Sequence, residues 1–356
     1  MQRPPRRGRG AGIDPPQRFT GRQRLLDGDE LDHEAATGEG APDTTRVFRD
    51  TSRSVISRND SPDIPFEASP NPYRGCEHGC PYCYARPTHE YLGLSAGLDF
   101  ERQLFAKLDA PALLAAELAR PSWTPRHHAL SGVTDPYQPI ERRLGITRGC
   151  LEVLAAHRQP VGLITKNALV TRDVDLIAEL ARYGAVRVAL SITTLDEDLR
   201  RRLEPRTSTA ADRLRAIRTL AEAGVPVGVN VAPVIPGLND HEVPSILEAA
   251  ADHGAQGAAW TLLRLPGAVE PVFVEWLPAQ APQRAERVLA RVRETRGGAL
   301  SDARFGHRMR GEGVYAEQLK RLFEVHRRRA GLERTWPPLA TEHFRVPGRA
   351  TQERLF

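Results

Sequence analysis

The sequence predicts an α/β fold in which a mainly parallel sheet is covered by helices. Through the middle of the chain, short apolar runs rich in Val, Ile and Leu alternate with amphipathic segments. Continuous apolar runs are typical of strands that are buried on both faces, and their alternation with helices indicates parallel β/α units. With a first strand near Asn71–Arg74, the pattern predicts about six such units.

The remaining predicted strands lie at Ala129–Val133, Val161–Thr165, Val186–Ile192, Val225–Ile235 and Gly257–Leu265. The segments between them place apolar residues three or four positions apart, which is the spacing of one helical face. The predicted helices are Glu141–His157, Asp173–Tyr183, Thr209–Ala223 and Asp240–His253. In such folds functional side chains gather where the strands end, at the carboxyl edge of the sheet.

The two ends of the chain differ from this central region. Residues 1–50 combine Arg, Gly and Pro with an acidic stretch from Asp27 to Asp43, and their low hydrophobicity predicts a disordered arm. The arm is either simply exposed to solvent or a basic segment that binds nucleic acid. We assign residues 51–265 to the α/β core. Residues 266–334 predict a helical cap, with helices near Ala281–Thr295 and Gly313–Arg329, and residues 335–356 predict an irregular tail.

Three of the four cysteines lie on one short segment. Cys76, Cys80 and Cys83 have the spacing C-x3-C-x2-C. Thiolates at short fixed spacings usually hold iron–sulfur clusters, and three of them leave the fourth iron of a 4Fe-4S cluster without a protein ligand. The alternative is a zinc site with His78 or His89 as fourth ligand, although zinc ligands normally come as two separated pairs. Cys150 lies on the apolar face of a predicted helix and is expected to be a buried small hydrophobe.

The cysteine content and the hydropathy pattern also bear on location. Four cysteines in 356 residues, with no signal peptide, predict a reducing, cytoplasmic environment. No stretch approaches about 18 consecutive apolar residues, so no membrane partner is expected.

The cysteine spacing, with Tyr82 directly before the last cysteine, resembles the cluster motif of the radical S-adenosylmethionine (SAM) superfamily. The resemblance implies a partial (β/α)6 barrel, a 4Fe-4S cluster on Cys76, Cys80 and Cys83, and SAM bound to the open iron. An electron from a donor such as flavodoxin or ferredoxin then cleaves SAM to a 5′-deoxyadenosyl radical, which abstracts hydrogen from a substrate. In this family the residue at the position of Tyr82 packs beside the adenine of SAM.

The run from Arg53 to about Arg310 resembles the spore photoproduct lyase-like group of this superfamily, whose bacterial members are named as DNA repair photolyases. The motifs that carry this resemblance are SRNDSPDIPF, NPYRGCEHGCPYCYARPTHEYLG, TDPYQPIERRLGITR, LEPRTST, VAPVIPGLND and FGHRMRGEGVY. The resemblance implies a substrate in DNA or a nucleotide lesion. The alternatives are the same chemistry on a small molecule, RNA or protein, and a non-catalytic metal-bearing module that binds nucleic acid.

One position departs from this group. Authentic spore photoproduct lyases carry a cysteine on the second strand that returns a hydrogen atom to the product radical. Gly132 stands at that place here, which puts lesion cleavage by that route in doubt and makes Tyr82 or Tyr84 the candidate hydrogen donor.

The ends of the second and third predicted strands supply several SAM contacts. Thr134, Asp135 and Glu141 lie in a polar, proline-containing run that cannot continue a strand. The resemblance implies that a carboxylate here, Asp135 or Glu141, accepts a hydrogen bond from the SAM amino group, with turn formation as the alternative. It also implies that Lys166 contacts the SAM carboxylate, whereas the alternative is a solvated strand end.

Later strand ends complete the predicted SAM site. The resemblance implies that Ser191 lies near the methionyl group and that the backbone at Ile235 and Gly237 lies at the adenine. Arg206 either reaches the ribose or carboxylate of SAM or pairs with Glu204.

Two features favour nucleic acid as a partner. The formal charge is +5, and arginines cluster at Arg327–Arg329, although solvated arginine is common on such surfaces. The chain ends in QERLF, which resembles the Q-x-x-L-F peptide with which bacterial repair proteins and polymerases dock on the DNA sliding clamp. Docking would bury Leu355 and Phe356 and leave Gln352 to hydrogen-bond at the rim of the pocket, whereas the alternative is a frayed C-terminus. Arg264, on the last predicted strand, is a candidate to face an anionic substrate.

Overall fold

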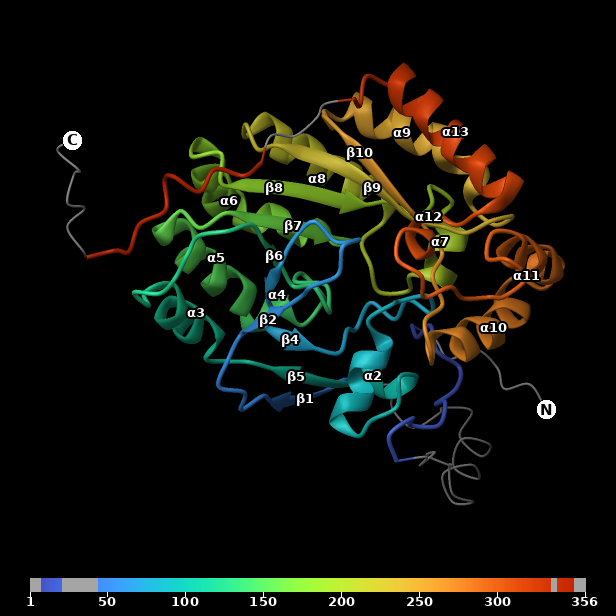
Figure 1. Ribbon diagram of the computed structural model, residues 1–356, viewed down its shortest axis with the longest axis horizontal. Helices are drawn as coiled ribbons and strands as arrows, with labels where there is room; N and C mark the ends of the chain where they lie inside the picture. Colours follow the sequence, from blue (N-terminus) through green and yellow to red (C-terminus); the bar gives the residue numbers. More distant parts are fainter. Residues whose placement is uncertain (1–7, 21–43, 334–337, 349–356) are drawn as a thin grey trace.

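The computed structural model describes residues 8–20, 44–333 and 338–348. Its centre is a seven-stranded sheet with the strand order β10-β9-β8-β7-β6-β3-β2 (Figure 1). From β3 to β10 all neighbouring strands are parallel and follow one another in sequence, whereas β2 at the edge is antiparallel to β3. This arrangement confirms the predicted α/β fold with a parallel sheet.

The strands of this sheet follow the apolar runs. Each of the predicted strands from the second to the sixth overlaps an observed one, and Val161–Thr165 has the predicted bounds. The strands are β2 Ile56–Arg58, β3 Ala68–Pro70, β6 His128–Leu130, β7 Val161–Thr165, β8 Val186–Ser191, β9 Val227–Val234 and β10 Ala258–Leu262.

The predicted first strand is placed wrongly. The first parallel strand is β3, and Tyr73–Arg74 forms β4, which belongs to a second, three-stranded sheet with the order β1-β5-β4. The chain changes direction at Asn71, whose side-chain amide donates to the Ser69 carbonyl at 2.8 Å and so ends the strand. The other strands of the second sheet are β1 Arg46–Arg49 and β5 Gln103–Ala106.

Helices follow the parallel strands, as the periodicity predicts. The predicted helix Glu141–His157 is two helices, because Gly145 interrupts it with a left-handed φ of 66°. The observed helices from the cysteine loop to β10 are η1 Arg86–Leu92, α2 Leu98–Arg102, α3 Ala110–Leu118, α4 Glu141–Leu144, α5 Ile146–His157, η2 Ala168–Asp173, α6 Val174–Arg182, α7 Glu197–Leu203, α8 Ala210–Glu222, η3 Asp240–Glu242 and α9 Val243–Asp252.

The region after β10 is helical, as predicted, and contains α10 Val269–Gln280, η4 Pro282–Arg284, α11 Ala285–Glu294, α12 His307–Arg310 and α13 Gly313–Arg329. Of these, α10 was not predicted. The last helix, α13, lies along α9 on the outside of the sheet (Figure 1). Within the described ranges, no helix combines the length and the apolar character needed to cross a bilayer. The domain boundaries at residues 50, 265 and 334 stay predictions.

Two apolar cores hold these layers together. In the larger core, Val188 and Val229 of the sheet pack with Ile217 of α8 and Leu247 of α9, and all of them are fully buried. Burial of one such side chain is worth about 1.5–3 kcal/mol. The smaller core joins the C-terminal helices α10 and α11 to the cysteine loop, because it includes both Cys80 and Tyr82.

The parallel strands form an open barrel. Among the described residues no strand pairing joins β10 to β2 or β3, so the sheet keeps two free edges. Side chains connect these edges, because Asp63, in the loop between β2 and β3, accepts hydrogen bonds from the Gly306 amide at 2.7 Å and from Arg308 Nε at 2.5 Å. We call these contacts the Asp63 bridge. Arg308 belongs to α12, which packs against β10.

Part of the segment that was predicted to be a disordered arm is packed. Residues 8–20 run beside the cysteine loop, and Arg9 and Ala11 are buried. Composition misses this packing because the contacts are made by backbone amides, by glycines that allow close approach and by polar side chains such as Arg9 and Gln17, none of which raises hydropathy. We call residues 8–20 the N-terminal segment.

Candidate active site

The three cysteines lie on the loop that follows β4. Gly75 and Gly79 shape this loop with left-handed φ values of 77° and 70°. The Cys76 amide donates to the Phe100 carbonyl at 2.9 Å, and the Cys83 amide donates to the Cys80 carbonyl at 3.2 Å. Cys76 and Cys80 are buried, Cys83 is partly exposed, and all three thiols are free.

The loop faces the residues that follow β6. The Glu77 amide donates to Gln138 Oε1 at 2.9 Å, and the Gln138 side chain donates to the Gly75 carbonyl at 3.1 Å. His78 Nδ1 lies 3.4 Å from Asp135 Oδ2. The cysteines therefore stand at the carboxyl edge of the parallel sheet, where the sequence placed the functional groups.

Burial raises the pKa of all three cysteine thiols, because it penalises the thiolate form. A bound metal reverses this preference, since a coordinating thiol is deprotonated outright. Three free thiols on one loop, none of them committed to a disulfide, fit the donor set of a cluster that takes each thiolate on a different iron. A single metal ion is a different case: in the part of the chain that the structure describes, no group of three or more His, Cys, Asp or Glu side chains is arranged to hold one.

The two histidines that could complete a zinc site face other partners. His78 lies between Asp135 and Asn167, whose amide nitrogen is 3.4 Å from Nε2. His89 Nε2 is 2.9 Å from the Gln103 carbonyl, and its ring packs edge-on against Phe100. Burial lowers the pKa of both rings, to about 4 for His89.

The two candidate carboxylates have different surroundings. Glu141 is fully buried and accepts from Tyr73 Oη at 2.5 Å, from the Thr147 amide at 2.9 Å and from Arg172 Nη2 at 2.7 Å. Such a network is typical of a structural ion pair. Asp135 instead lies beside the cysteine loop, where its Oδ2 is 3.4 Å from His78 Nδ1.

Asp135 also orders the end of β7. Its Oδ1 accepts from Thr165 Oγ1 at 2.7 Å, and its Oδ2 accepts from the Lys166 amide at 2.8 Å. The other predicted residue of this run, Thr134, shares a 2.7 Å hydrogen bond with Ser131. Asp135 thus links the strand that carries Lys166 to the loop that carries the cysteines.

Lys166 and Tyr82, which were predicted separately as SAM contacts, lie near each other. The Lys166 ammonium lies 5.8 Å from the centroid of the Tyr82 ring. Among the described residues this ammonium has no hydrogen-bond or ion-pair partner, although it is close enough to lower the pKa values of Glu204, Cys80 and Cys83. A cation with this environment is suited to an anionic ligand group.

Of the remaining predicted contacts, Ser191 and Arg206 have different surroundings. Ser191 ends β8 and is buried, and its carbonyl accepts from Arg213 at 2.8 Å. The suggested pairing of Arg206 with Glu204 is wrong, because Arg206 Nη1 donates to Glu77 Oε1 at 3.1 Å.

The backbone amides of Ile235 and Gly237 already have acceptors. The Ile235 amide donates to Asn239 Oδ1 at 2.6 Å, and the Gly237 amide donates to Asp240 Oδ2 at 2.8 Å. Gly237 has the left-handed φ of 78° that allows the backbone to turn there. Recognition of an adenine at this segment would therefore use carbonyl groups.

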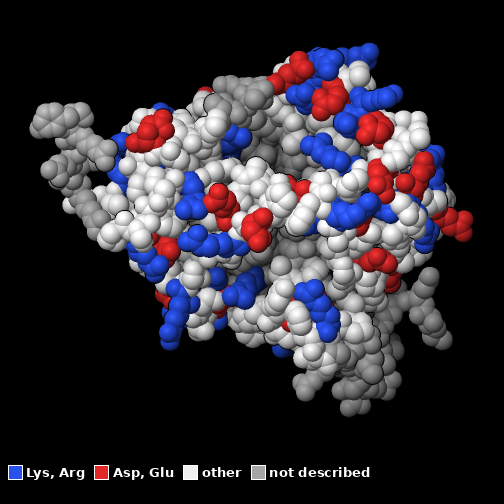
Figure 2. All heavy atoms as spheres, viewed as in Figure 1, with Lys and Arg blue, Asp and Glu red and all other residues white. Residues whose placement is uncertain are grey.

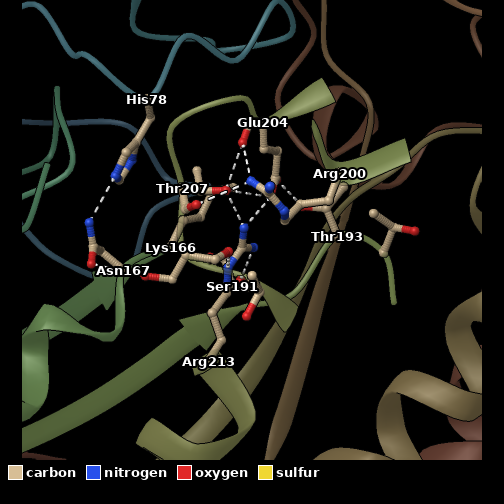
Figure 3. Close-up of polar contacts among 12 residues, drawn as sticks. His78, Lys166, Asn167, Ser191, Thr193, Arg200, Glu204, Thr207 and Arg213 are labelled. Atoms are coloured by element: carbon tan, nitrogen blue, oxygen red, sulfur yellow. Dashed lines mark hydrogen bonds and ion pairs between the residues drawn. The ribbon is translucent and has the colours of Figure 1, made fainter. Parts of the chain in front are cut away.

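Sequence reasoning missed the central polar cluster of the site. Glu204, which lies beside Arg213 and Arg200 in Figure 3, is fully buried. Hydroxyl groups of Tyr82 and Thr193 both donate to its Oε1. Arg213 pairs with its Oε2 at 2.5 Å. Although burial raises the pKa of Glu204, Arg213, Lys166 and the two hydroxyls lower it more, to about 2.

A second missed feature anchors the cysteine loop to the N-terminal segment. Glu101 and Arg86 form a fully buried ion pair at 2.5 Å, and Arg86 Nε donates to the Cys80 carbonyl at 2.9 Å. The amides of Gly10 and Ala11 donate to the same Glu101 carboxylate at 3.2 and 2.9 Å. One carboxylate thus fixes both the loop and the segment that covers it.

Comparison with known proteins agrees with this geometry. A family model described as the radical SAM superfamily matches residues 70–250. An uncharacterised protein of Mycobacterium tuberculosis is 41% identical over 226 residues, which are 63% of this chain and 66% of the relative. An uncharacterised protein of Methanocaldococcus jannaschii is 29% identical over 172 residues, which are 48% of this chain and 62% of the relative. The chain therefore spans slightly less than two thirds of the length of the curated relatives it matches.

Solved structures of spore photoproduct lyase share the fold. The lyase complexed with dinucleoside spore photoproduct has a TM-score of 0.57 at 18% identity, covering 80% of this chain and 79% of that one. A mutant of the lyase in which one tyrosine is replaced by phenylalanine has a TM-score of 0.58 at 16% identity, covering 85% of this chain and 92% of that one.

An open barrel of sequential parallel strands, with three free cysteines on one loop at its carboxyl edge, defines the radical SAM class of protein. The family match extends over half of the chain and spans β3 to α9. This chain belongs to the radical SAM superfamily.

Replacement of Glu204 by Gln is expected to change how stability depends on pH. The folded-state pKa of Glu204 is about 2, below its ordinary 4.5, so its charge stabilises the fold above pH 4.5 and this contribution is lost as the pH falls toward 2. The shift corresponds to about 3 kcal/mol. The difference in unfolding free energy between wild type and Glu204→Gln, measured by urea denaturation, is therefore constant near neutral pH and narrows below pH 4.5. The exposed Glu317→Gln variant is the control, and an equal narrowing in both variants would contradict the assignment.

Replacement of Gly10 by Ala is expected to release the N-terminal segment. A methyl group at Gly10 would lie 1.6 Å from the Gly79 carbonyl oxygen, which is backbone and cannot move aside cheaply. Tryptic cleavage after Arg9, which is buried in the wild type, should speed up by about tenfold or more. In the control Gly12→Ala, the methyl group meets only the end of the flexible Glu275 side chain. Equal cleavage rates in the two variants would refute this role of Gly10.

Proposed function

We propose that this protein is a radical SAM enzyme that uses a three-cysteine 4Fe-4S cluster to cleave SAM reductively. The observation that carries the proposal is the loop of three free thiols at the carboxyl edge of the open barrel, beside a lysine without an anionic partner among the described residues. When bound, the cluster and SAM supply a 5′-deoxyadenosyl radical that removes hydrogen from a substrate.

The residues of this chain bind and orient the cofactors. Cys76, Cys80 and Cys83 hold the cluster, and burial of the loop keeps water away from it. Lys166 binds the carboxylate of SAM. Asp135, which already orders the Lys166 backbone, accepts from the SAM amino group.

We propose DNA or a nucleotide lesion as the substrate, and residues near Cys83 support this choice. Tyr84 is 57% exposed, and its hydroxyl donates to the Gly132 carbonyl at 3.0 Å. Arg264, two residues after β10, is close enough to Tyr84 to favour its phenolate electrostatically, and its hydrogen bond to Met309 Sδ at 3.3 Å leaves its charge unneutralised. No carboxylate of the described residues lies within ion-pair distance of Arg264. An exposed aromatic ring beside an uncompensated arginine suits a base and its phosphate.

Net charge adds little to this argument. In the view of Figure 2, basic and acidic side chains are interspersed and do not form one continuous basic surface. The alternatives therefore stay open: a small molecule, RNA or protein as substrate, or a non-catalytic metal-bearing module.

The hydrogen donor is part of the proposal. A side chain at Gly132 would place its Cβ 2.9 Å from Ser69 Oγ, so this position is narrow as well as lacking a thiol. Tyr84 reaches the Gly132 backbone, whereas the Tyr82 hydroxyl is bound to Glu204. Tyr84 is therefore the better candidate of the two.

Further partners follow from the same proposal. Reductive cleavage requires an electron donor such as flavodoxin or ferredoxin. The suggested clamp-binding residues Gln352, Leu355 and Phe356 lie outside the described residues, so clamp docking stays a prediction, as does a cytoplasmic location.

Removal of one cysteine is expected to abolish the cluster. Anaerobically reconstituted wild type should carry about four irons and four sulfides per chain and convert SAM to 5′-deoxyadenosine with dithionite. Cys83→Ala should lose the brown colour and this turnover. Cys150→Ala, which removes a fully buried thiol of α5 outside the loop, should retain both. A single zinc without iron or sulfide in the wild type would contradict the proposal.

Replacement of Arg264 by Gln tests the anionic substrate. Binding of a fluorescein-labelled single-stranded oligonucleotide should weaken by about tenfold, since one phosphate contact is lost. Arg293→Gln makes the same charge change on the exposed surface of α11 and should have little effect. Equal affinity for both variants, or no binding by the wild type, would exclude Arg264 as a nucleic-acid contact.

A further inference from the structure

We infer that Glu204 is a positioning residue that fixes the Tyr82 ring against Lys166 and thereby prepares the SAM site. The inference rests on the proposed function and concerns a residue that touches neither the cysteines nor the predicted SAM contacts other than Tyr82. Glu204 lies just after α7, far in sequence from the cysteine loop, and comes to it only through folding.

The Tyr82 ring is held at two points. At one end its hydroxyl donates to Glu204 Oε1. At its face stands the Lys166 ammonium, 5.8 Å from the ring centroid. The ring itself packs in the smaller core, where a phenylalanine would pack equally well. The contacts of its hydroxyl, the hydrogen bond to Glu204 and a longer 3.5 Å contact with Thr193 Oγ1, are therefore what distinguishes tyrosine at this position.

Glu204 in turn is held rigidly. Arg213 Nη2 pairs with its Oε2 at 2.5 Å, and Thr193 Oγ1 donates to its Oε1 at 2.5 Å. Its backbone carbonyl accepts from Arg200 at 2.9 Å (Figure 3). With its carboxylate oxygens and its backbone fixed in this way, the carboxylate defines where the Tyr82 hydroxyl must lie.

The same cluster reaches the ends of two parallel strands. Arg213 Nη1 donates to the Ser191 carbonyl at 2.8 Å, and Arg213 Nε donates to the Ser208 carbonyl at 2.9 Å. The Ser208 amide donates to the Lys166 carbonyl at 3.2 Å. One buried ion pair thus ties together Tyr82, Lys166 and Ser191, three residues that were predicted separately as SAM contacts.

The charges are balanced so that Lys166 remains available. Glu204 and Arg213 are both fully buried and neutralise each other. A buried carboxylate without Arg213 would attract the Lys166 ammonium and compete with an incoming anion. With the pair complete, the lysine stands beside the ring without an anionic partner among the described residues, ready for the carboxylate of SAM.

The decisive experiment compares two variants that each remove one hydroxyl from the same Glu204 oxygen. Tyr82→Phe removes the hydroxyl that Glu204 holds. Thr193→Val removes one contact of Glu204 and a weaker neighbour of the Tyr82 hydroxyl, 3.5 Å away, but keeps the Tyr82–Glu204 hydrogen bond. Anaerobically reconstituted proteins are titrated with SAM, and the electron paramagnetic resonance spectrum of the reduced cluster is recorded with and without SAM. Glu204→Gln is less informative alone, because it leaves Arg213 buried and unpaired and threatens folding.

Tyr82→Phe is expected to weaken the Kd for SAM by about tenfold and to change the spectral shift that SAM produces, with wild-type iron content. Thr193→Val should keep the wild-type shift and a Kd within about threefold of wild type. Wild-type Kd and shift in Tyr82→Phe would overturn the inference, as would equal losses in both variants. If the wild type itself binds a cluster but no SAM, the proposed function fails instead.

Discussion

The buried ion pair between Arg86 and Glu101 is the interaction on which the cysteine loop depends. Both side chains are excluded from solvent, and Arg86 also holds the carbonyl of Cys80. Removal of one partner from such a pair typically costs about 3–5 kcal/mol, because the other charge stays buried and unpaired. The loop has little regular secondary structure of its own, so this pair and the glycines Gly75 and Gly79 determine where the thiols stand.

A second buried pair, between Glu204 and Arg213, organises the other half of the site. Both pairs lie C-terminal to the loop in sequence, and each contacts a residue of the cluster motif: Arg86 holds Cys80, and Glu204 holds Tyr82. Cofactor sites of this kind require side chains that are locked before the ligand arrives. Here Cys80 and Tyr82 are each held by a member of a buried ion pair, which explains why charged groups without solvent contact lie at the carboxyl edge of the sheet.

The sequence was informative where local pattern carries the signal. Apolar runs such as Val161–Thr165 and the cysteine spacing are visible within a few residues, so the parallel sheet and the metal-ligand candidates could be predicted. The roles of Glu204 and Glu101 could not, because Tyr82 lies 122 residues from the first and Gly10 lies 91 residues from the second, and no periodicity marks such contacts.

The choice between Asp135 and Glu141 needed coordinates for the same reason: the two carboxylates look equivalent in sequence and differ only in what surrounds them. The packing of residues 8–20 was missed because glycine-rich, arginine-rich composition is typical of unfolded chain.

The Asp63 bridge has a consequence for access to the radical chemistry. Two motifs of unassigned purpose, SRNDSPDIPF and FGHRMRGEGVY, meet there. Among the described residues, hydrogen bonds of the Asp63 side chain, and not strand pairing, connect the β2–β3 loop to the segment beside β10. A barrel that is closed by strand pairing can open only if that pairing breaks. Here the two edges of the sheet can separate when the hydrogen bonds of Asp63 break, while every strand stays paired. Access to the carboxyl edge of the sheet from this side therefore depends on these hydrogen bonds and not on the apolar core.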